Sequence, residues 1–358
     1  MKGTIVAFNG HGLPLTIEEH NVRAIEPEEI LVRNLYTTLC GSDLHTYSGA
    51  RKELCPTVLG HEIVGEIMEI GAAHSSLDDA GNPLRVGDRI TWSVFASDAD
   101  CRCGQMGMPQ KGNGLFKYGH AQVTEADAFH GGLATSCVLR KGTAVLKVPG
   151  GMPLSVAATL NCAIATVSGA MRLAGDVKGR RVLVTGLGLL GITAVAMCRE
   201  AGAETIVVAD VNDDRLRLAR RFGADETINF LNLSQEDRDN ATRRFDIALD
   251  MSGAPDAIEY GLRTLDTGGI TVWVGSVFST RPITLDAEMM VRQMLTIKGL
   301  HNYNYEDFRH AVSFMANNWN RYPFLATVEK EFALEAAEEA FQYALQHKPI
   351  RVGVRINP

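Results

Sequence analysis

The chain has 358 residues, of which 46% are hydrophobic and 22% charged, and its formal net charge is −7. This length exceeds what one hydrophobic core usually organises, so a folded globular protein with two domains is expected. The negative charge disfavours a broad surface for nucleic acid or for an anionic membrane.

Targeting and redox signals are consistent with a cytoplasmic protein. No apolar run in the sequence approaches the roughly 20 residues that span a bilayer. The first residues also lack the apolar segment and cleavage site of a signal peptide. The seven cysteines are odd in number and spread along the chain. They fit reduced thiols or metal ligands in the cytosol better than a disulfide framework.

Short strand-like segments separated by glycine and proline fill the first 150 residues, and they are rich in Val, Ile and aromatic residues. They span residues 4–8, 29–36, 63–71, 89–95 and 144–151. From residue 153 an apolar helical stretch leads into alternating strands and helices, which predicts a parallel sheet with crossover helices. These segments are 181–186, 189–202, 205–210, 214–223, 245–253, 268–275 and 294–300.

The segments together predict an α/β protein of two domains. We place a β-rich domain at 1–152 and a doubly wound parallel-sheet domain at 153–299. Two amphipathic helices, at 305–318 and 334–346, and a strand at 349–356 follow. Because this tail is too short to form a core of its own, we expect residues 300–358 to complete the first domain.

A glycine triplet follows the strand at 181–185 and opens the next helix, which is the context of a dinucleotide-binding turn. Gly186, Gly188 and Gly191 lie in G-x-G-x-x-G register, with Leu189 and Leu190 between the last two glycines. The glycines allow a tight turn, close approach of the pyrophosphate to backbone N–H groups, and close packing of helix on strand.

The acidic residue that usually accompanies such a turn is also present. Asp210 ends the next strand, 19 residues beyond Gly191. Its carboxylate can accept both ribose hydroxyls and would repel a 2′-phosphate, which favours NAD over NADP. Arg215 either flanks the adenine or lies on the solvated face of its helix. The alternative for the whole segment is a nucleotide-free doubly wound domain.

Two cysteines and a histidine, far apart in sequence, are candidate ligands of a catalytic zinc. Cys40, His61 and Cys162 form a Cys₂His set, which leaves a fourth position open for substrate. Taken singly, each would more often be a buried core residue. An alcohol bound at such a zinc loses its proton near neutral pH, and Ser42 and His45 are placed to carry that proton away. A nicotinamide would then accept the hydride.

Several segments carry a resemblance to a known family. "CGSDLH", "GHEIVGEIMEIG", "VGDRI", "GGLATSCVL", "GLGLLG" and "VVAD" occur in one order over nearly the whole chain. The chain resembles the zinc-dependent medium-chain dehydrogenases/reductases of the alcohol and polyol dehydrogenase family. The resemblance implies a GroES-like catalytic domain and a Rossmann NAD-binding domain.

The same resemblance implies roles for individual residues. Cys40, His61 and Cys162 would be the zinc ligands, and Glu62 a carboxylate that can exchange onto the metal. Ser42 and His45 would relay the proton through the nicotinamide ribose. The nicotinamide would be lined by Thr166, Val274, Gly275 and the segment 300–302.

These observations predict an NAD(H)-dependent zinc alcohol dehydrogenase acting on a zinc-bound primary or secondary alcohol or its carbonyl product. We expect a small-molecule substrate and a homodimer or homotetramer. The alternative enzyme is a polyol or sugar dehydrogenase. The alternative of a different class is a nucleotide-binding relative without catalysis.

A narrower resemblance concerns the substrate. "GMPQKGNGLFKYGH" and "GLHNYNYEDFRHAVSF" resemble alcohol dehydrogenases linked with phosphonate catabolism, which implies a hydroxyalkylphosphonate or its aldehyde as substrate. A phosphonate needs charge-assisted donors. The candidates are Arg51, Lys52, Lys111, Lys117 and His120, although any single one of them is more often solvated surface.

One part of the chain departs from the family. Many members hold a second, structural zinc with C-x₂-C-x₂-C-x₇-C ligands, and these positions fall here on Asp98, Cys101, Gly104 and Gly112. A closed structural site needs four ligands, so we expect this zinc to be absent. Cys101 and the neighbouring Cys103 are then ordinary loop cysteines or oxidation-prone thiols.

Overall fold

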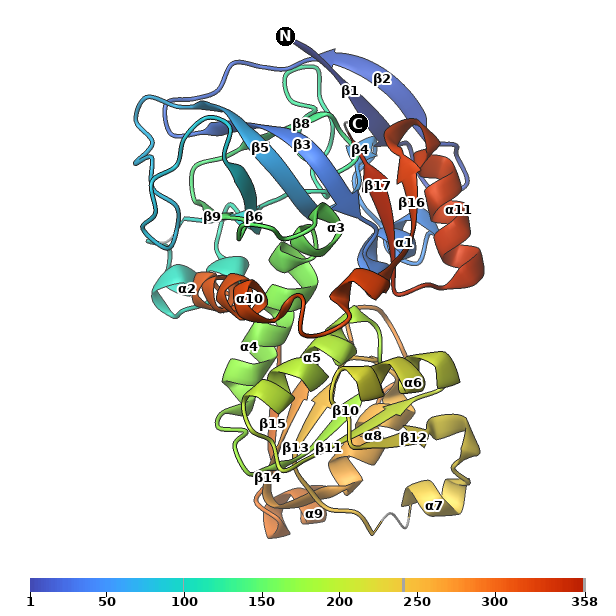
Figure 1. Ribbon diagram of the computed structural model, residues 1–358. Helices are drawn as coiled ribbons and strands as arrows, with labels where there is room; N and C mark the ends of the chain where they lie inside the picture. The colour runs from blue at the N-terminus through green and yellow to red at the C-terminus, as the bar shows by residue number, and fades with distance from the viewer. Residues whose placement is uncertain (99, 240–241, 357–358) are drawn as a thin grey trace. The chain divides into compact units, whose positions relative to one another are not determined.

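The computed structural model describes residues 1–98, 100–239 and 242–356, and the chain forms two compact units (Figure 1). The first unit comprises Met1–Ala165 and Asn304–Pro358, and the second comprises Thr166–Tyr303. Residues from Asn304 onward thus belong to the first unit, and completion of the first domain by the whole of 300–358 stays a prediction. The domain boundaries at 152/153 and 299/300 stay a prediction.

The first unit is built from two sheets. A three-stranded antiparallel sheet has the order β2-β1-β4, and a larger sheet has the order β16-β17-β3-β5-β6-β7, with β8 paired to β3 and β9 to β6. Its strands are β1 (Lys2–Phe8), β2 (Thr16–Asn21), β3 (Ile30–Thr38), β4 (Thr57–Val58), β5 (Glu62–Ile70), β6 (Arg89–Ala96), β7 (Phe116–Lys117), β8 (Ser136–Leu139), β9 (Thr143–Lys147), β16 (Val328–Ala333) and β17 (Arg351–Arg355).

The helices of the first unit are mostly short. They are α1 (Gly41–Tyr47), α2 (Arg102–Gln105), η1 (Pro109–Lys111), α3 (Leu154–Ala157), η2 (Leu160–Ile164), α10 (Tyr305–Asn318), η4 (Phe324–Thr327), η5 (Leu334–Ala336) and α11 (Ala337–His347). β17 pairs antiparallel with β3 in the middle of the large sheet. Because β3 leads directly into α1, this pairing brings the end of the chain beside residue 40.

The second unit is a six-stranded parallel sheet of order β12-β11-β10-β13-β14-β15, the doubly wound Rossmann order. Its strands are β10 (Arg181–Thr185), β11 (Thr205–Asp210), β12 (Glu226–Asn229), β13 (Phe245–Asp250), β14 (Leu265–Trp273) and β15 (Thr296–Gly299). Its helices are α4 (Ala165–Ala174), α5 (Leu189–Glu200), α6 (Asp213–Arg221), η3 (Phe230–Asn232), α7 (Gln235–Asp239), α8 (Pro255–Arg263) and α9 (Ala287–Arg292). The first residue of α4, Ala165, is the last residue of the first unit's first segment. The central strands are buried, as is usual for a sheet covered on both faces. The predicted fold class, a GroES-like β-rich domain with a Rossmann parallel sheet, is confirmed.

The apolar helical stretch expected from residue 153 is present, and its length reaches that of a membrane span. Residues Leu154–Ala174 form 21 helical residues with a mean hydropathy of 1.5, enough by length and composition to cross a membrane. However, 78% of that apolar window is buried inside the protein, as in the core helix of a globular fold. The expectation that no apolar run approaches bilayer length is therefore corrected, and burial accounts for the apolar character.

Candidate functional site

The three candidate zinc ligands come together in the first unit. The ligand atoms of Cys40, His61 and Cys162 all lie within 4.8 Å of one another. Ligands of a tetrahedral zinc, at about 2.0–2.3 Å from the metal, lie about 3.3–3.8 Å apart. Two thiols and an imidazole at this separation fit zinc by geometry and by the chemistry of the donor atoms.

Each cysteine is held by the local backbone. Cys40 is the residue before α1 and is buried. Cys162 lies in η2, a π-helical turn within the long helix, and such turns often present side chains at functional sites. Hydrogen bonding from the Cys162 thiol, followed by the charge of Arg351, holds the pKa of Cys40 well below its usual range. The pKa of Cys162 is raised in turn, chiefly by its hydrogen bond to Cys40 and then by burial. Zinc binding would require both cysteines to be deprotonated.

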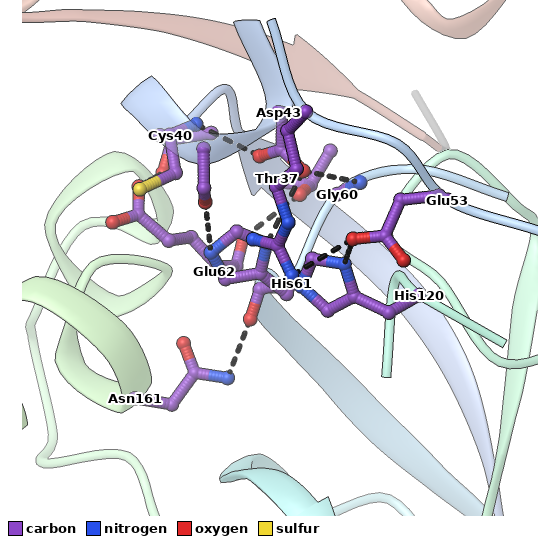
Figure 2. A network of polar contacts seen from close by, with 12 residues as sticks. Thr37, Cys40, Asp43, Glu53, Gly60, His61, Glu62, His120 and Asn161 are labelled. Atoms are coloured by element: carbon purple, nitrogen blue, oxygen red, sulfur yellow. Dashed lines mark hydrogen bonds and ion pairs between the residues drawn. The ribbon is translucent and has the colours of Figure 1, made fainter. Parts of the chain in front are cut away.

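Asp43 fixes the loops that carry two of the ligands. Its Oδ2 accepts a hydrogen bond from the backbone N–H of Cys40 (2.9 Å), and its Oδ1 accepts from the backbone N–H of Gly60 (3.2 Å). The same Oδ1 lies 3.2 Å from Nδ1 of His61 (Figure 2). Burial lowers the pKa of His61, but the Asp43 carboxylate and then Cys40 oppose it, and the pKa is raised well above its usual value. A carboxylate at Nδ1 leaves Nε2 to face a metal, the usual arrangement around a metal-binding histidine.

Asn161 fixes the third ligand. Its Nδ2 donates to the backbone oxygens of His61 (2.9 Å) and Trp92 (2.8 Å), and the side chain is fully buried. The π-helical turn is thereby attached to the loop that carries His61 (Figure 2). Cys162, the next residue, is held beside the other two ligands as a result.

A buried ion pair lies next to the cysteines. Glu62 is fully buried, and Arg351 of β17 donates to both of its oxygens at 2.7 and 2.9 Å. The Thr38 hydroxyl donates to the same carboxylate at 2.5 Å, and Nη2 of Arg351 lies 3.8 Å from Sγ of Cys40. Burial raises the pKa of Glu62, and the charge of Arg351 opposes this. Arg351 thus holds the carboxylate in place and puts a positive charge beside a metal thiolate.

The second unit contains a pocket at the carboxyl ends of its strands, where doubly wound sheets bind ligands. The pocket has a volume of about 480 Å³ and contains Gly186, Asp210, Phe230, Arg238 and Ser252 in its lining. Asp210 accepts hydrogen bonds from the backbone N–H groups of Leu187 (2.6 Å) and Asn212 (2.9 Å), so its carboxylate is oriented at the pocket wall.

The glycine triplet has the conformation that its register predicts. Gly186 has φ +83°, which favours glycine, and a Cβ there would lie 2.7 Å from Ser252. A Cβ on Gly191 would lie 1.9 Å from the carbonyl oxygen of Gly186, so only glycine allows α5 to pack this closely on its strand. Gly188 precedes α5, and nothing lies within 4 Å of a Cβ built there, so backbone N–H groups at the helix start are open to a phosphate.

Comparison with known proteins identifies the family. Residues 26–150 match the alcohol dehydrogenase GroES-like domain, and residues 190–317 match the zinc-binding dehydrogenase domain. L-threonine 3-dehydrogenase of Shewanella sp. (strain ANA-3) is 30% identical over 297 residues, covering 78% of this chain and 80% of that protein. The chain belongs to the zinc-dependent medium-chain dehydrogenases.

Two further relatives cover nearly all of this dehydrogenase. L-threonine 3-dehydrogenase of Coxiella burnetii is 29% identical over 333 residues, 91% of each chain. The crystal structure of an alcohol dehydrogenase from Thermotoga maritima superimposes with a TM-score of 0.92 at 27% identity, covering 99% of both chains. The protein is thus an oxidoreductase with a catalytic zinc and a nicotinamide dinucleotide as cofactors.

Of the other predicted site residues, Ser42 and His45 lie on α1 beside the ligand cluster, whereas Arg215 lies on α6. Ser42 lies with its hydroxyl 3.4 Å from Nε2 of His61, and His45 is one turn further along α1, so both lie on one face of the helix. Glu62 lies outside the cluster of ligand atoms within 4.8 Å, and its exchange onto the metal stays a prediction. Arg215, on α6, is not among the residues that line the pocket.

The residues assigned to the nicotinamide all belong to the second unit. Thr166 is buried at the start of α4, and Val274 and Gly275 follow β14 directly. Gly275 packs so closely that a Cβ would lie 2.2 Å from the Gly253 nitrogen. Leu189 and Leu190 open α5, and the backbone N–H of Leu300 donates to the Trp273 oxygen. Their contacts with the cofactor stay a prediction.

The dehydrogenase forms a helical turn at the positions that the resemblance assigns to a structural zinc. Cys101 precedes α2, and its Sγ accepts a hydrogen bond from the Gly104 nitrogen at 3.4 Å. Asp98 accepts at Oδ1 from the Asp100 nitrogen, and a Cβ on Gly112 would lie 3.0 Å from Sγ of Cys101. The predicted ligand positions thus use their polar atoms in local turns, and the absence of this zinc stays a prediction.

Sequence reasoning missed three residues of the site, namely Asp43, Asn161 and Arg351. Asp43 lies within the "CGSDLH" segment, and its spacing from Cys40 is that of a helix-capping acid, a signal that could have indicated its role. Asn161 and Arg351 carry no local signal, because their partners lie 100 and 289 residues away in sequence.

Proposed function

We propose that the chain is an NAD-dependent alcohol dehydrogenase that oxidises a small primary or secondary alcohol to its carbonyl compound, with a hydroxyalkylphosphonate as the expected substrate. The observation that carries the proposal is the Cys40–His61–Cys162 cluster, with the Ser42 hydroxyl 3.4 Å from His61. Zinc bound there would supply Lewis-acid chemistry, lowering the pKa of an alcohol hydroxyl.

The chain's own residues then handle the proton and the cofactor. Ser42 would accept the proton that leaves the alcohol and pass it toward His45, which lies one turn later on the same face of α1. The glycine turn with Gly186, Gly188 and Gly191, together with Asp210, would hold the dinucleotide, whose nicotinamide would supply the hydride acceptor; one alcohol and one NAD⁺ would give one carbonyl compound, one NADH and one proton. Asp210 at the pocket wall supports NAD as the dinucleotide. A cytoplasmic location and a homodimer or homotetramer complete the proposal.

A substrate panel with NAD tests the activity. It contains 2-hydroxyethylphosphonate, sorbitol, L-threonine and propan-1-ol, and turnover is followed as NADH formation. Turnover of the phosphonate alcohol with the highest kcat/KM supports the proposal. Turnover of sorbitol with no phosphonate activity indicates a polyol dehydrogenase. A zinc-free preparation that binds NADH and oxidises no alcohol indicates a non-catalytic relative.

Metal analysis of the purified protein should give about one zinc per chain, because only the catalytic ligand set is complete. Of the four structural-zinc positions, Asp98, Cys101, Gly104 and Gly112, only one is a cysteine. Plasma mass spectrometry after gel filtration into metal-free buffer measures the ratio. A ratio of two zinc ions per chain would contradict the interpretation of residues 98–112.

Replacing Asp210 with alanine should relax the choice of cofactor. We expect the ratio of kcat/KM for NAD to that for NADP to fall about 10- to 100-fold, since the ribose loses a charged acceptor and a 2′-phosphate is no longer repelled. Asp214→Ala is the matched control, because Asp214 is an exposed acid in the first turn of α6. Equal ratios in wild type and Asp210→Ala would show that Asp210 does not contact the ribose.

A further inference from the structure

Lys117 is a half-buried cation in a mainly positive environment. Within the described part of the chain its ammonium group has no ion pair or hydrogen bond, although the residue is partly withdrawn from solvent. Burial, together with the positive charges of Arg51 and Lys111, lowers the pKa of Lys117. A partly buried charge that is repelled by its neighbours is unfavourable unless an anion compensates it.

The strand directs Lys117 away from the core. Phe116 and Tyr118, its neighbours in sequence, stack edge-on at 5.2 Å between ring centroids, and Phe116 also contacts the Arg140 guanidinium. Tyr118 is fully buried. Because successive side chains of a strand point to opposite faces, Lys117 faces the other side.

The turn that follows Lys117 packs on the loop of a metal ligand. The His120 N–H donates to the Lys117 carbonyl oxygen, closing the turn. A Cβ on Gly119 would lie 2.7 Å from the oxygen of Gly60 and 3.1 Å from Cβ of His61. The turn that begins at Lys117 is therefore packed against the loop that carries the metal ligand His61.

A chain of contacts connects Arg51 with the same metal ligand. Arg51 donates to Glu53 at 2.8 Å. Glu53 lies 3.0 Å from Nδ1 of His120, and the His120 and His61 rings are 5.3 Å apart between centroids (Figure 2). Glu53 is the acidic group named among the charges that act on Lys117. Its carboxylate already forms an ion pair with Arg51 and contacts the His120 ring nitrogen. Against its single negative charge stand the positive charges of Arg51 and Lys117.

We propose that Lys117, Arg51 and Lys111 form an oxyanion subsite next to the metal ligand His61, which selects alcohols that carry a phosphonate or carboxylate group. The inference rests on the proposed function, because it describes how that site chooses its substrate. Lys117 is the principal donor, since it has no partner to lose. Arg51 uses one of its guanidinium nitrogens for Glu53 and keeps further N–H groups for a ligand. Lys52 is exposed and, in contrast to Arg51 and Lys111, is not among the charges that act on Lys117, so it has no part in the subsite.

The first test compares matched alcohols on the zinc-loaded enzyme. Lys117→Met keeps the length of the side chain and removes its charge. We expect kcat/KM for 2-hydroxyethylphosphonate to fall about 10- to 100-fold, mainly through KM, with kcat/KM for propan-1-ol changing less than about threefold. Lys117→Arg should restore most of the phosphonate activity, and Lys52→Met is the matched control. Equal losses on the anionic and the neutral alcohol would overturn the proposal.

The second test does not depend on turnover, so it separates this inference from the proposed function. Binding of methylphosphonate to the holoenzyme is measured by calorimetry for wild type, Lys117→Met and Lys52→Met. Weaker binding, by about tenfold or more, in Lys117→Met alone supports the subsite even if no tested alcohol is oxidised. Unchanged binding in Lys117→Met would place the anion elsewhere and overturn the proposal. Repeating the kinetics with 3-hydroxypropanoate shows whether a carboxylate or a phosphonate is preferred.

Discussion

Cys162→Ser should abolish zinc binding and lower kcat by about 10³-fold or more. A serine hydroxyl is not ionised at neutral pH and is a poor zinc ligand, so only two of three ligands remain. Loss of a Lewis acid removes several kcal/mol of transition-state stabilisation, which corresponds to this factor. Zinc content by plasma mass spectrometry and NADH formation are measured on the same preparation.

Cys103→Ser is the matched control for this variant. Cys103 is a half-buried thiol in α2, outside the three-ligand cluster. The control should keep its zinc and its activity, and circular dichroism should show that both variants are folded. If Cys162→Ser keeps a full complement of zinc, the ligand assignment is wrong. If Cys103→Ser loses metal, the segment 98–112 holds zinc after all.

Arg351→Met should lower the free energy of unfolding by about 3–5 kcal/mol, because it leaves the fully buried Glu62 carboxylate without its counter-charge. The variant should also bind zinc more weakly, since the positive charge 3.8 Å from the Cys40 sulfur is lost. Urea unfolding of the holoenzyme and competition for zinc with a chelator measure the two effects.

Two further variants show whether the unpaired charge is the cause. Arg351→Met combined with Glu62→Gln removes both charges of this ion pair, so no carboxylate is left without its counter-charge and most of the lost stability should return. Arg355→Met, on the same strand, removes an exposed ion pair with Glu331 and should cost less than about 1 kcal/mol. A loss below about 1 kcal/mol in Arg351→Met itself would show that the Glu62 carboxylate is neutral or solvated.

The strands that sequence patterns failed to indicate lie mostly at sheet edges. β2, β4, β7, β12 and β16 each end a sheet in the observed strand order. β2 reads TIEEHN and β16 reads VEKEFA, and such charged, short edge strands lack the apolar alternation of buried ones. The central strands, by contrast, are apolar over most of their length and were predicted within a few residues.

The sequence by itself determined the chemistry of the site and the glycine turn. A strand, a glycine triplet, a helix and an acid are local features of the sequence. Because a side chain at Gly186 or Gly191 would clash, the turn requires glycine there, and the sequence shows it directly. The likeness of the ligand segments to a family identified Cys40, His61 and Cys162 as a set.

Only the tertiary structure decided what surrounds them. Arg351 lies 311 residues from Cys40 and 289 from Glu62, and β17 brings it there by pairing with β3. Burial creates the need for such partners, and burial is a property of the packed chain that no local pattern contains.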